Sequence, residues 1–266
     1  MDGNDNHNKI LIILTGSTYT DIRQNMGDFD SWIKQRCYDL WDKWDTIKIE
    51  DSKPDEIENY AGVIFTGSHN TVTKEYPYLS RAEHLLDKIV DKEIPTFGIC
   101  FGHQLINKLF GGKIVRSPVG IEIGVVDIQL TLEGMSDPWF INSNTGKIKV
   151  YSCHDDLVID PGVNFVQLAW NNFSIYQATS YQGFIRTVQF HPEFYKPILA
   201  AYIRKNIDKL KTQYNQSLHS IKSISKTIDN KRELPMSEDA LINFVKYVKK
   251  LNYQETDLDN IIRQQN

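Results

Sequence analysis

The chain has 266 residues, of which 41% are hydrophobic and 24% are charged, and its formal net charge is −4. This length suits one large domain or two small ones, and the composition is that of a globular protein, which excludes disordered, collagen-like and coiled-coil chains. Because there is no overall excess of basic residues, the charge favours neither a nucleic-acid partner nor a membrane partner.

The first 112 residues alternate between buried strands and amphipathic helices. Continuous apolar runs predict strands that are buried on both faces, alternating apolar residues predict the short strand at 46–50, and apolar residues three or four positions apart predict helices. The predicted elements are strands at 10–14, 46–50, 61–66 and 94–99 and helices at 28–41, 79–90 and 103–110. This order predicts an α/β fold with a mostly parallel sheet and helices on both faces.

Beyond residue 112 the pattern changes to short strands that are separated by Gly, Pro and Asn. We expect a small antiparallel extension of the sheet here, rather than further strand–helix–strand units. The polar stretch 135–146 predicts a surface loop. The expected strands lie at 114–115, 121–132, 147–151, 164–169, 174–178 and 184–190.

The last quarter of the chain differs in charge and in pattern. Residues 197–266 hold 12 basic and 8 acidic residues, so the rest of the chain has a net charge of −8. Apolar residues at helical spacing follow Pro192 and recur over 241–251, with Ser237 as the expected N-cap of the later helix. We therefore expect residues 197–266 to be a helical C-terminal extension with solvated basic faces, and docking onto an acidic partner or lid is the alternative.

The most informative motif lies between a predicted strand and a predicted helix, and it reads Gly98-Ile99-Cys100-Phe101-Gly102-His103-Gln104. A nucleophile on such a turn is held outward at the carboxyl end of a parallel strand, where open α/β sheets bind ligands. Glycines two residues before and after Cys100 leave room for the bend. The start of the helix favours the thiolate, and the N–H of Phe101 can bind an oxyanion. We interpret Cys100 as a reactive thiol rather than a buried structural cysteine.

A cysteine nucleophile needs a base, and the base needs a group that orients it. His191 and Glu193 directly follow a predicted strand, so both side chains can converge from one strand end. His154, which precedes Asp155 and Asp156, is the alternative base. Of the other histidines, we expect His7 in the N-terminal tail, His84 and His219 on helix surfaces and His103 in a first helical turn.

A third motif, Thr66-Gly67-Ser68, follows the strand that precedes the nucleophile strand. Gly67 at this strand end can turn its N–H into the cleft and supply a second oxyanion donor beside Phe101. Turns of this kind are common, and the place of this one in the strand order is what points to a functional site.

Cysteine use and the N-terminus bear on the compartment. Cys37, Cys100 and Cys153 have no paired spacing, which argues against a disulfide framework and favours a reducing cytosol. No Cys or His residues have zinc-ligand spacing, and we expect no metal and no cofactor. Residues 1–8 predict a disordered tail without a signal peptide, and the longest aliphatic run, at 10–14, is far shorter than the ~20 residues of a membrane span. We therefore expect a cytoplasmic protein without a membrane partner.

These motifs together resemble the class I, or triad, glutamine amidotransferase domain, in particular its stand-alone GMP-synthetase-like and γ-glutamyl peptidase-like members. The resemblance covers residues 9–193 and implies a flavodoxin-like domain at 9–196. It implies that Cys100 is the nucleophile, His191 the base and then the acid, and Glu193 the group that orients His191. It also implies oxyanion donors at Gly67 and Phe101, substrate contacts at Gln104 and Ser68, and a structural or cleft-lining role for His154.

The activity that the resemblance implies is hydrolysis of the γ-amide of glutamine or of a γ-glutamyl compound, through a γ-glutamyl thioester on Cys100. Residues 197–266 are too short to form an ATP-using synthase, and the sequence has neither a P-loop nor a Ser-Gly-Gly-x-Asp loop. The first alternative is therefore a glutaminase subunit that delivers ammonia to a separate synthase chain. The second alternative is a non-catalytic binding protein on the same scaffold.

Overall fold

The computed structural model describes residues 8–140, 146–212 and 239–252. The strands are β1 (Ile10–Leu14), β2 (Trp44–Lys48), β3 (Gly62–Phe65), β4 (Thr96–Ile99), β5 (Lys113–Arg116), β6 (Glu122–Leu130), β7 (Lys147–His154), β8 (Asp156–Asp160), β9 (Phe165–Trp170), β10 (Ala178–Tyr181) and β11 (Ile185–Val188). The helices are α1 (Thr20–Met26), α2 (Phe29–Cys37), α3 (Leu79–Asp91), α4 (Phe101–Leu109), α5 (Leu132–Ser136), α6 (Lys196–Thr212) and a helix at 239–252. Two short 3-10 segments, η2 (Ile49–Asp51) and η3 (Pro54–Asn59), follow β2.

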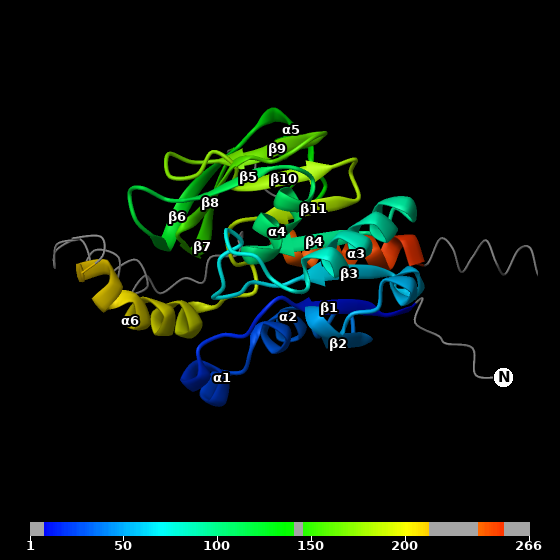
Figure 1. Ribbon diagram of the computed structural model, residues 1–266, viewed down its shortest axis with the longest axis horizontal. Helices are drawn as coiled ribbons and strands as arrows, with labels where there is room; N and C mark the ends of the chain where they lie inside the picture. The colour runs from blue at the N-terminus through cyan, green and yellow to red at the C-terminus, as the bar shows by residue number, and fades with distance from the viewer. Residues whose placement is uncertain (1–7, 141–145, 213–238, 253–266) are drawn as a thin grey trace, which may run out of the picture.

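A nine-stranded sheet in the order β2-β1-β3-β4-β11-β10-β9-β6-β7 forms the centre of the molecule (Figure 1). β2, β1, β3, β4 and β11 pair in parallel, and β10, β9, β6 and β7 continue the sheet with antiparallel pairing. β5 and β8 form a separate two-stranded sheet. The predicted α/β, flavodoxin-like arrangement with an antiparallel extension is confirmed.

Alternate residues of β1 enter two different cores, because this strand is apolar on both faces. Ile10 and Ile12 pack in a cluster with α2 and with the helix at 239–252, whereas Leu11 and Ile13 pack with α3 and α4. All four side chains are buried. The unbroken apolar run is thus explained by a strand that helices cover on both faces.

The helix at 239–252, red in Figure 1, packs directly on the parallel strands. Phe244 and Val248 are fully buried, and the ring of Phe244 lies 5.7 Å from that of Phe97 in β4. A Cβ on Gly62 of β3 would lie 2.8 Å from Val248, so glycine allows this helix to approach the sheet. α6 likewise buries apolar side chains beside α1 and α2. The domain boundary at residue 196 stays a prediction, and both described helices beyond it bury part of the core. The expected N-cap, Ser237, lies outside the described residues.

The surface loop predicted at 135–146 is wrong for its central residues. Trp139 is fully buried and Phe140 is 5% exposed. Trp139 packs edge-on against Phe97, with ring centroids 5.1 Å apart, and beneath the guanidinium of Arg186 at 4.5 Å. Two aromatic residues in a polar stretch show no periodicity, so the sequence pattern could not identify them as core. Residues 141–145 lie outside the described part of the chain.

Other differences from the prediction are local. The strand expected at 174–178 begins only at Ala178, because Asn171 holds the preceding turn by accepting the N–H groups of Phe173 and Ser174. α1 was not predicted, since Ile22 is its one buried residue and gives no helical periodicity. β8 was also not predicted.

Among the helices that the structure describes, none combines the length and the apolar character required to cross a membrane.

Candidate active site

Cys100 lies at the turn between β4 and α4 in a conformation that residues other than glycine rarely adopt, with φ 51° and ψ −99°. Its N–H donates to the carbonyl of Val188 in β11, at 2.8 Å. A Cβ on Gly102 would lie 2.4 Å from the carbonyl oxygen of Phe65, and one on Gly98 would lie 3.0 Å from the Gly102 backbone. Both glycines therefore fit the tight bend that the sequence predicts.

The surroundings of Cys100 favour the protonated form of its thiol. Burial raises the pKa of the Cys100 thiol well above its ordinary value, and the neighbouring Cys153 and Glu193 raise it further. The N–H of Phe101 acts in the opposite direction. The favourable effect expected from the start of α4 is therefore present but smaller than the effect of burial.

His191 and Glu193 follow β11, the strand beside β4. Val188 pairs with Ile99, so His191 follows β11 at the same sheet edge at which Cys100 follows β4. His191 Nδ1 lies 2.7 Å from Glu193 Oε1, and both residues are buried. The imidazole stacks on Phe194 at 4.0 Å and on Phe29 at 6.3 Å, which fixes the plane of the ring. Because Nδ1 faces the carboxylate, Nε2 is the nitrogen that can exchange a proton.

Gly67 and Ser68 follow β3, the strand on the other side of β4. A Cβ on Gly67 would lie 3.1 Å from Cε1 of His191, so Gly67 borders the imidazole. The carbonyl of Thr66 accepts the N–H of Gly102, at 3.1 Å, and joins this strand end to the start of α4. Ser68 Oγ accepts the N–H of Asn70, at 3.0 Å. The three sequence motifs thus meet at the carboxyl edge of β3, β4 and β11.

Gln104 of α4 faces a second amide, that of Gln189. Gln104 Nε2 donates to Gln189 Oε1 and to the carbonyl of Asp156, both at 3.1 Å. Gln189 Nε2 in turn lies 3.7 Å from the sulfur of Cys100. Gln189 was not among the predicted site residues. The signal that could have identified it is its position two residues before His191, which places both on the same side of an extended segment.

His154, the alternative base, is engaged with other groups. Its Nε2 lies 2.9 Å from Glu122 Oε2, and its Nδ1 lies 3.1 Å from the carbonyl of Asp156. Glu122 also accepts hydrogen bonds from Ser152, Asn171 and Gln177. Burial raises the pKa of Glu122, but the hydrogen bonds and the charge of His154 outweigh it and hold this pKa below its ordinary value. Both nitrogens of His154 are therefore occupied.

Of the other described histidines, His69 directly follows Ser68 and lies near His191, and burial lowers its pKa to about 4. His103, in the first turn of α4, is fully buried, and burial lowers its pKa to about 3. Its Nδ1 lies 2.6 Å from Thr187 Oγ1. His84 is exposed on α3, as predicted. His7 and His219 lie outside the described residues.

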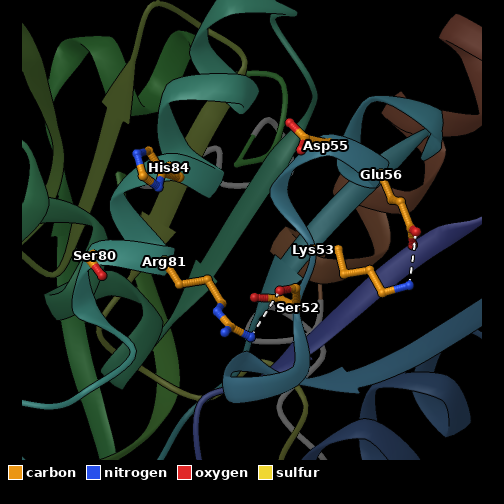
Figure 2. A pocket seen from close by; sticks show the side chains of 7 residues that line it. All are labelled: Ser52, Lys53, Asp55, Glu56, Ser80, Arg81 and His84. Atoms are coloured by element: carbon orange, nitrogen blue, oxygen red, sulfur yellow. Dashed lines mark hydrogen bonds and ion pairs between the residues drawn. The ribbon is translucent and has the colours of Figure 1, made fainter.

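A surface pocket lies between α3 and the segments η2 and η3, away from the three motifs (Figure 2). Arg81 donates to the carbonyls of Glu50 and Ser52, and Lys53 pairs with Glu56 at 3.0 Å, so its charges are largely satisfied within the protein. The pocket is lined by Ser52, Lys53, Asp55, Glu56, Ser80, Arg81 and His84.

Within the described ranges, no group of three or more His, Cys, Asp or Glu side chains could hold a metal ion.

Comparison with known proteins identifies the family. The sequence pattern of the family glutamine amidotransferase class-I matches residues 23–209, which include Cys100, His191 and Glu193. The chain belongs to this family. Its mostly parallel sheet, with Cys100 at the turn between β4 and α4, is the structural counterpart of that match.

Two curated relatives and one solved structure are similar to this glutamine amidotransferase class-I chain. Gamma-glutamyl peptidase 5 of Arabidopsis thaliana is 24% identical over 204 residues, which is 75% of this chain and 81% of that protein. A glutamine-hydrolyzing GMP synthase subunit of Pyrococcus abyssi is 30% identical over 166 residues, 62% of this chain and 81% of that protein. A glutamine amidotransferase from Thermotoga maritima has the same fold, with a TM-score of 0.67, 20% identity and coverage of 91% of this chain and 98% of that chain.

Proposed function

We propose that the protein hydrolyses the γ-amide of glutamine or of a γ-glutamyl compound, with Cys100 as nucleophile, His191 as base and acid, and Glu193 as the carboxylate that orients His191. The observation that carries this proposal is the strained turn at Cys100 beside a buried His191–Glu193 pair with a 2.7 Å contact. A nucleophile, a base and an orienting group in this order are the parts that thiol acyl transfer requires.

The proposed reaction begins when His191 Nε2 takes the thiol proton and the sulfur of Cys100 attacks the γ-carbonyl carbon. The oxyanion that forms accepts hydrogen bonds from the N–H groups of Phe101 and Gly67. The C–N bond then breaks, and the leaving nitrogen takes the proton from His191. Water, deprotonated by His191, cleaves the γ-glutamyl thioester and releases the γ-carboxylate while the thiol is reprotonated. Gln104 and Ser68 are proposed to contact the glutamyl group.

Hydrolysis without a partner is the first candidate, and it is supported by the similarity to the gamma-glutamyl peptidase over 75% of this chain. A glutaminase subunit that delivers ammonia to a separate synthase chain is the second candidate. The similarity to the Pyrococcus abyssi protein, which is named as one subunit of a GMP synthase, favours it at 30% identity. The two candidates share the chemistry at Cys100 and differ in the need for another chain.

One assay separates these candidates. The purified full chain is incubated with glutamine and with a panel of γ-glutamyl dipeptides, and ammonia, free amino acids and glutamate are measured. Turnover by the chain alone supports the hydrolase, and glutamine turnover that appears only with a synthase supports the second candidate. The matched control is Cys100→Ala, which we expect to abolish turnover and keep the fold. Wild-type turnover by this variant contradicts the proposed nucleophile, and no turnover under either condition leaves a binding protein.

We also propose that the protein acts in a reducing compartment such as the cytoplasm. The three cysteines are thiols in the structure, and the chemistry requires Cys100 as a thiol. Mass spectrometry of the protein isolated from its native source under alkylating conditions tests this, since a disulfide at Cys100 contradicts the proposal.

A further inference from the structure

The hydrogen bonds around Gln189 have a defined direction, because a carbonyl can only accept. The main-chain carbonyl of Asp156 lies 3.1 Å from the side-chain amide of Gln104, so Gln104 has to present its NH₂ group there. The same NH₂ group lies 3.1 Å from Gln189 Oε1. Gln189 therefore gives its oxygen to Gln104 and its NH₂ group to the sulfur of Cys100, 3.7 Å away.

A buried pair, Glu122 and His154, holds the far end of this chain of contacts. Glu122 and His154 lie directly opposite each other in the β6–β7 ladder. His154 faces the carbonyl of Asp156 through Nδ1 and the carboxylate of Glu122 through Nε2. Because a carbonyl can only accept, Nδ1 is the donor to Asp156. The carbonyl of Asp156 is thus held by His154 on one side and by Gln104 on the other.

Because these side chains are buried, only one orientation of each amide keeps its hydrogen bonds. Gln189 is fully buried, Gln104 is 3% exposed and His154 is 5% exposed. A buried amide that is turned the wrong way loses its hydrogen bonds without compensation from water. The carbonyl of Asp156 therefore fixes which way the Gln104 amide faces, and Gln104 in turn fixes which way the Gln189 amide faces.

We propose that Gln189 donates a hydrogen bond to the sulfur of Cys100 and stabilises its thiolate, and that Gln104, oriented by the carbonyl of Asp156, fixes the direction of this hydrogen bond. His154 is a positioning residue that acts through the same carbonyl. The inference rests on the proposed role of Cys100 as nucleophile. In this inference Gln104 orients the donor to the Cys100 sulfur, in addition to its proposed contact with the glutamyl group.

A second donor matters to the thiolate because most of its surroundings oppose it. Burial, Cys153, Glu193 and Asp155 all raise the pKa of the Cys100 thiol, and the N–H of Phe101 lowers it. Phe101 approaches the sulfur from α4, and Gln189 approaches it from the end of β11. An N–H donor binds a charged acceptor more strongly than a neutral one, so Gln189 favours the thiolate over the thiol.

The test is the rate at which iodoacetamide alkylates Cys100 in the full chain, at several pH values below the ordinary thiol pKa. Mass spectrometry of the peptide that contains Cys100 separates its reaction from those of Cys37 and Cys153. Gln189→Met keeps the length of the side chain and removes the donor, and we expect the rate to fall about three- to tenfold. A rate equal to or above that of the wild type overturns the proposal.

The matched control is Asn107→Leu, which removes another buried amide of α4. Asn107 contacts His103, Thr179 and Thr187 and takes no part in the chain of contacts to Cys100. We expect its alkylation rate to stay within about twofold of the wild type. An equal loss in this variant means that the rate reports general loosening of α4, and the proposal fails.

A second variant tests the direction of the hydrogen bonds. In Gln104→Glu the new carboxylate can only accept, so Gln189 turns its NH₂ group toward residue 104 and its oxygen toward the sulfur. We expect the alkylation rate to fall at least as far as in Gln189→Met, although the side chain keeps its shape. A wild-type rate contradicts the orienting role of Gln104.

The double variant separates orientation from the added charge. If Gln104 acts through Gln189, the Gln104→Glu change in the Gln189→Met background alters the rate by less than about twofold. A full further loss shows that the charge acts on Cys100 directly and overturns the orienting role.

Alkylation requires no turnover, so this inference and the proposed function can fail separately. A wild-type chain that hydrolyses nothing, with the expected order of alkylation rates, contradicts the proposed function and leaves the hydrogen bond to Cys100 supported. A wild-type chain that hydrolyses γ-glutamyl substrates, with an unchanged rate in Gln189→Met, contradicts the hydrogen bond alone.

Discussion

The molecule contains two buried histidine–glutamate pairs, His191–Glu193 and His154–Glu122, with contacts of 2.7 and 2.9 Å. In the second pair both ring nitrogens are engaged, and Glu122 accepts from three further side chains. In the first pair the imidazole is held on its flat faces by Phe29 and Phe194, and Glu193 Oε2 has no hydrogen-bond partner among the described residues. The distance within a pair therefore does not identify a base. What distinguishes the two is whether a ring nitrogen is left for proton transfer.

Replacing the histidine of each pair in the same way gives the largest expected contrast. Asparagine keeps an N–H donor for the carboxylate but cannot take up a proton at neutral pH. We expect His191→Asn to lower kcat/KM for the γ-glutamyl substrate on the order of 10²- to 10⁴-fold, because a general base is lost. The matched variant His154→Asn removes no proton acceptor, and its loss should stay below about tenfold. Equal losses in the two variants contradict the distinction between the pairs.

His154–Glu122 is called the saturated pair here because all of its ring nitrogens and carboxylate oxygens have partners. Its loss should lower the free energy of unfolding more than the loss of an exposed pair. In Glu122→Leu, Nε2 of His154 and the NH₂ groups of Asn171 and Gln177 lose their partner in a buried site. We expect the free energy of unfolding to fall by about 3–5 kcal/mol, measured by urea denaturation, because removing one member of a buried pair leaves its partners unsatisfied.

The β6–β7 ladder also offers a control for this stability experiment. Lys149 and Asp127 form an ion pair at 2.8 Å on the same two strands, and both side chains are exposed. Asp127→Ala should lower the free energy of unfolding by less than about 1 kcal/mol, because water screens an exposed pair. If both variants lose the same free energy, burial is not what makes the Glu122 pair important.

The sequence predicted the parts of the site that depend on local geometry. Gly98 and Gly102 around Cys100 indicate a tight turn, and a histidine and a glutamate two residues apart after a strand can share one strand end. The structure places all of these at one sheet edge, and their catalytic roles stay proposals. The amphipathic stripe at 241–251 was also predicted, but not the face that it covers, because close approach depends on Gly62 in a distant strand.

The remaining contacts depend on pairings that no local pattern encodes. Glu122 meets His154 through the register of two antiparallel strands, and Gln189 meets Gln104 across the junction of β11 and α4. Phe29 reaches His191 from a helix early in the chain, where its apolar spacing predicted only a core residue. Periodicity shows that a side chain is buried, and only the tertiary arrangement shows which group it meets.

Acidification should lower the free energy of unfolding through protonation of Glu122 in the His154–Glu122 pair. The folded state holds the pKa of Glu122 below its ordinary value, so the unfolded chain binds this proton at a higher pH than the folded protein. The stability from this group is therefore fully present above the unfolded glutamate pKa of about 4.3 and is lost as the pH falls through the lower folded value. Urea denaturation of the wild type and of Glu122→Gln over this acidic range measures the difference. The wild type should lose stability more steeply, and parallel curves contradict a charged Glu122 in the folded protein.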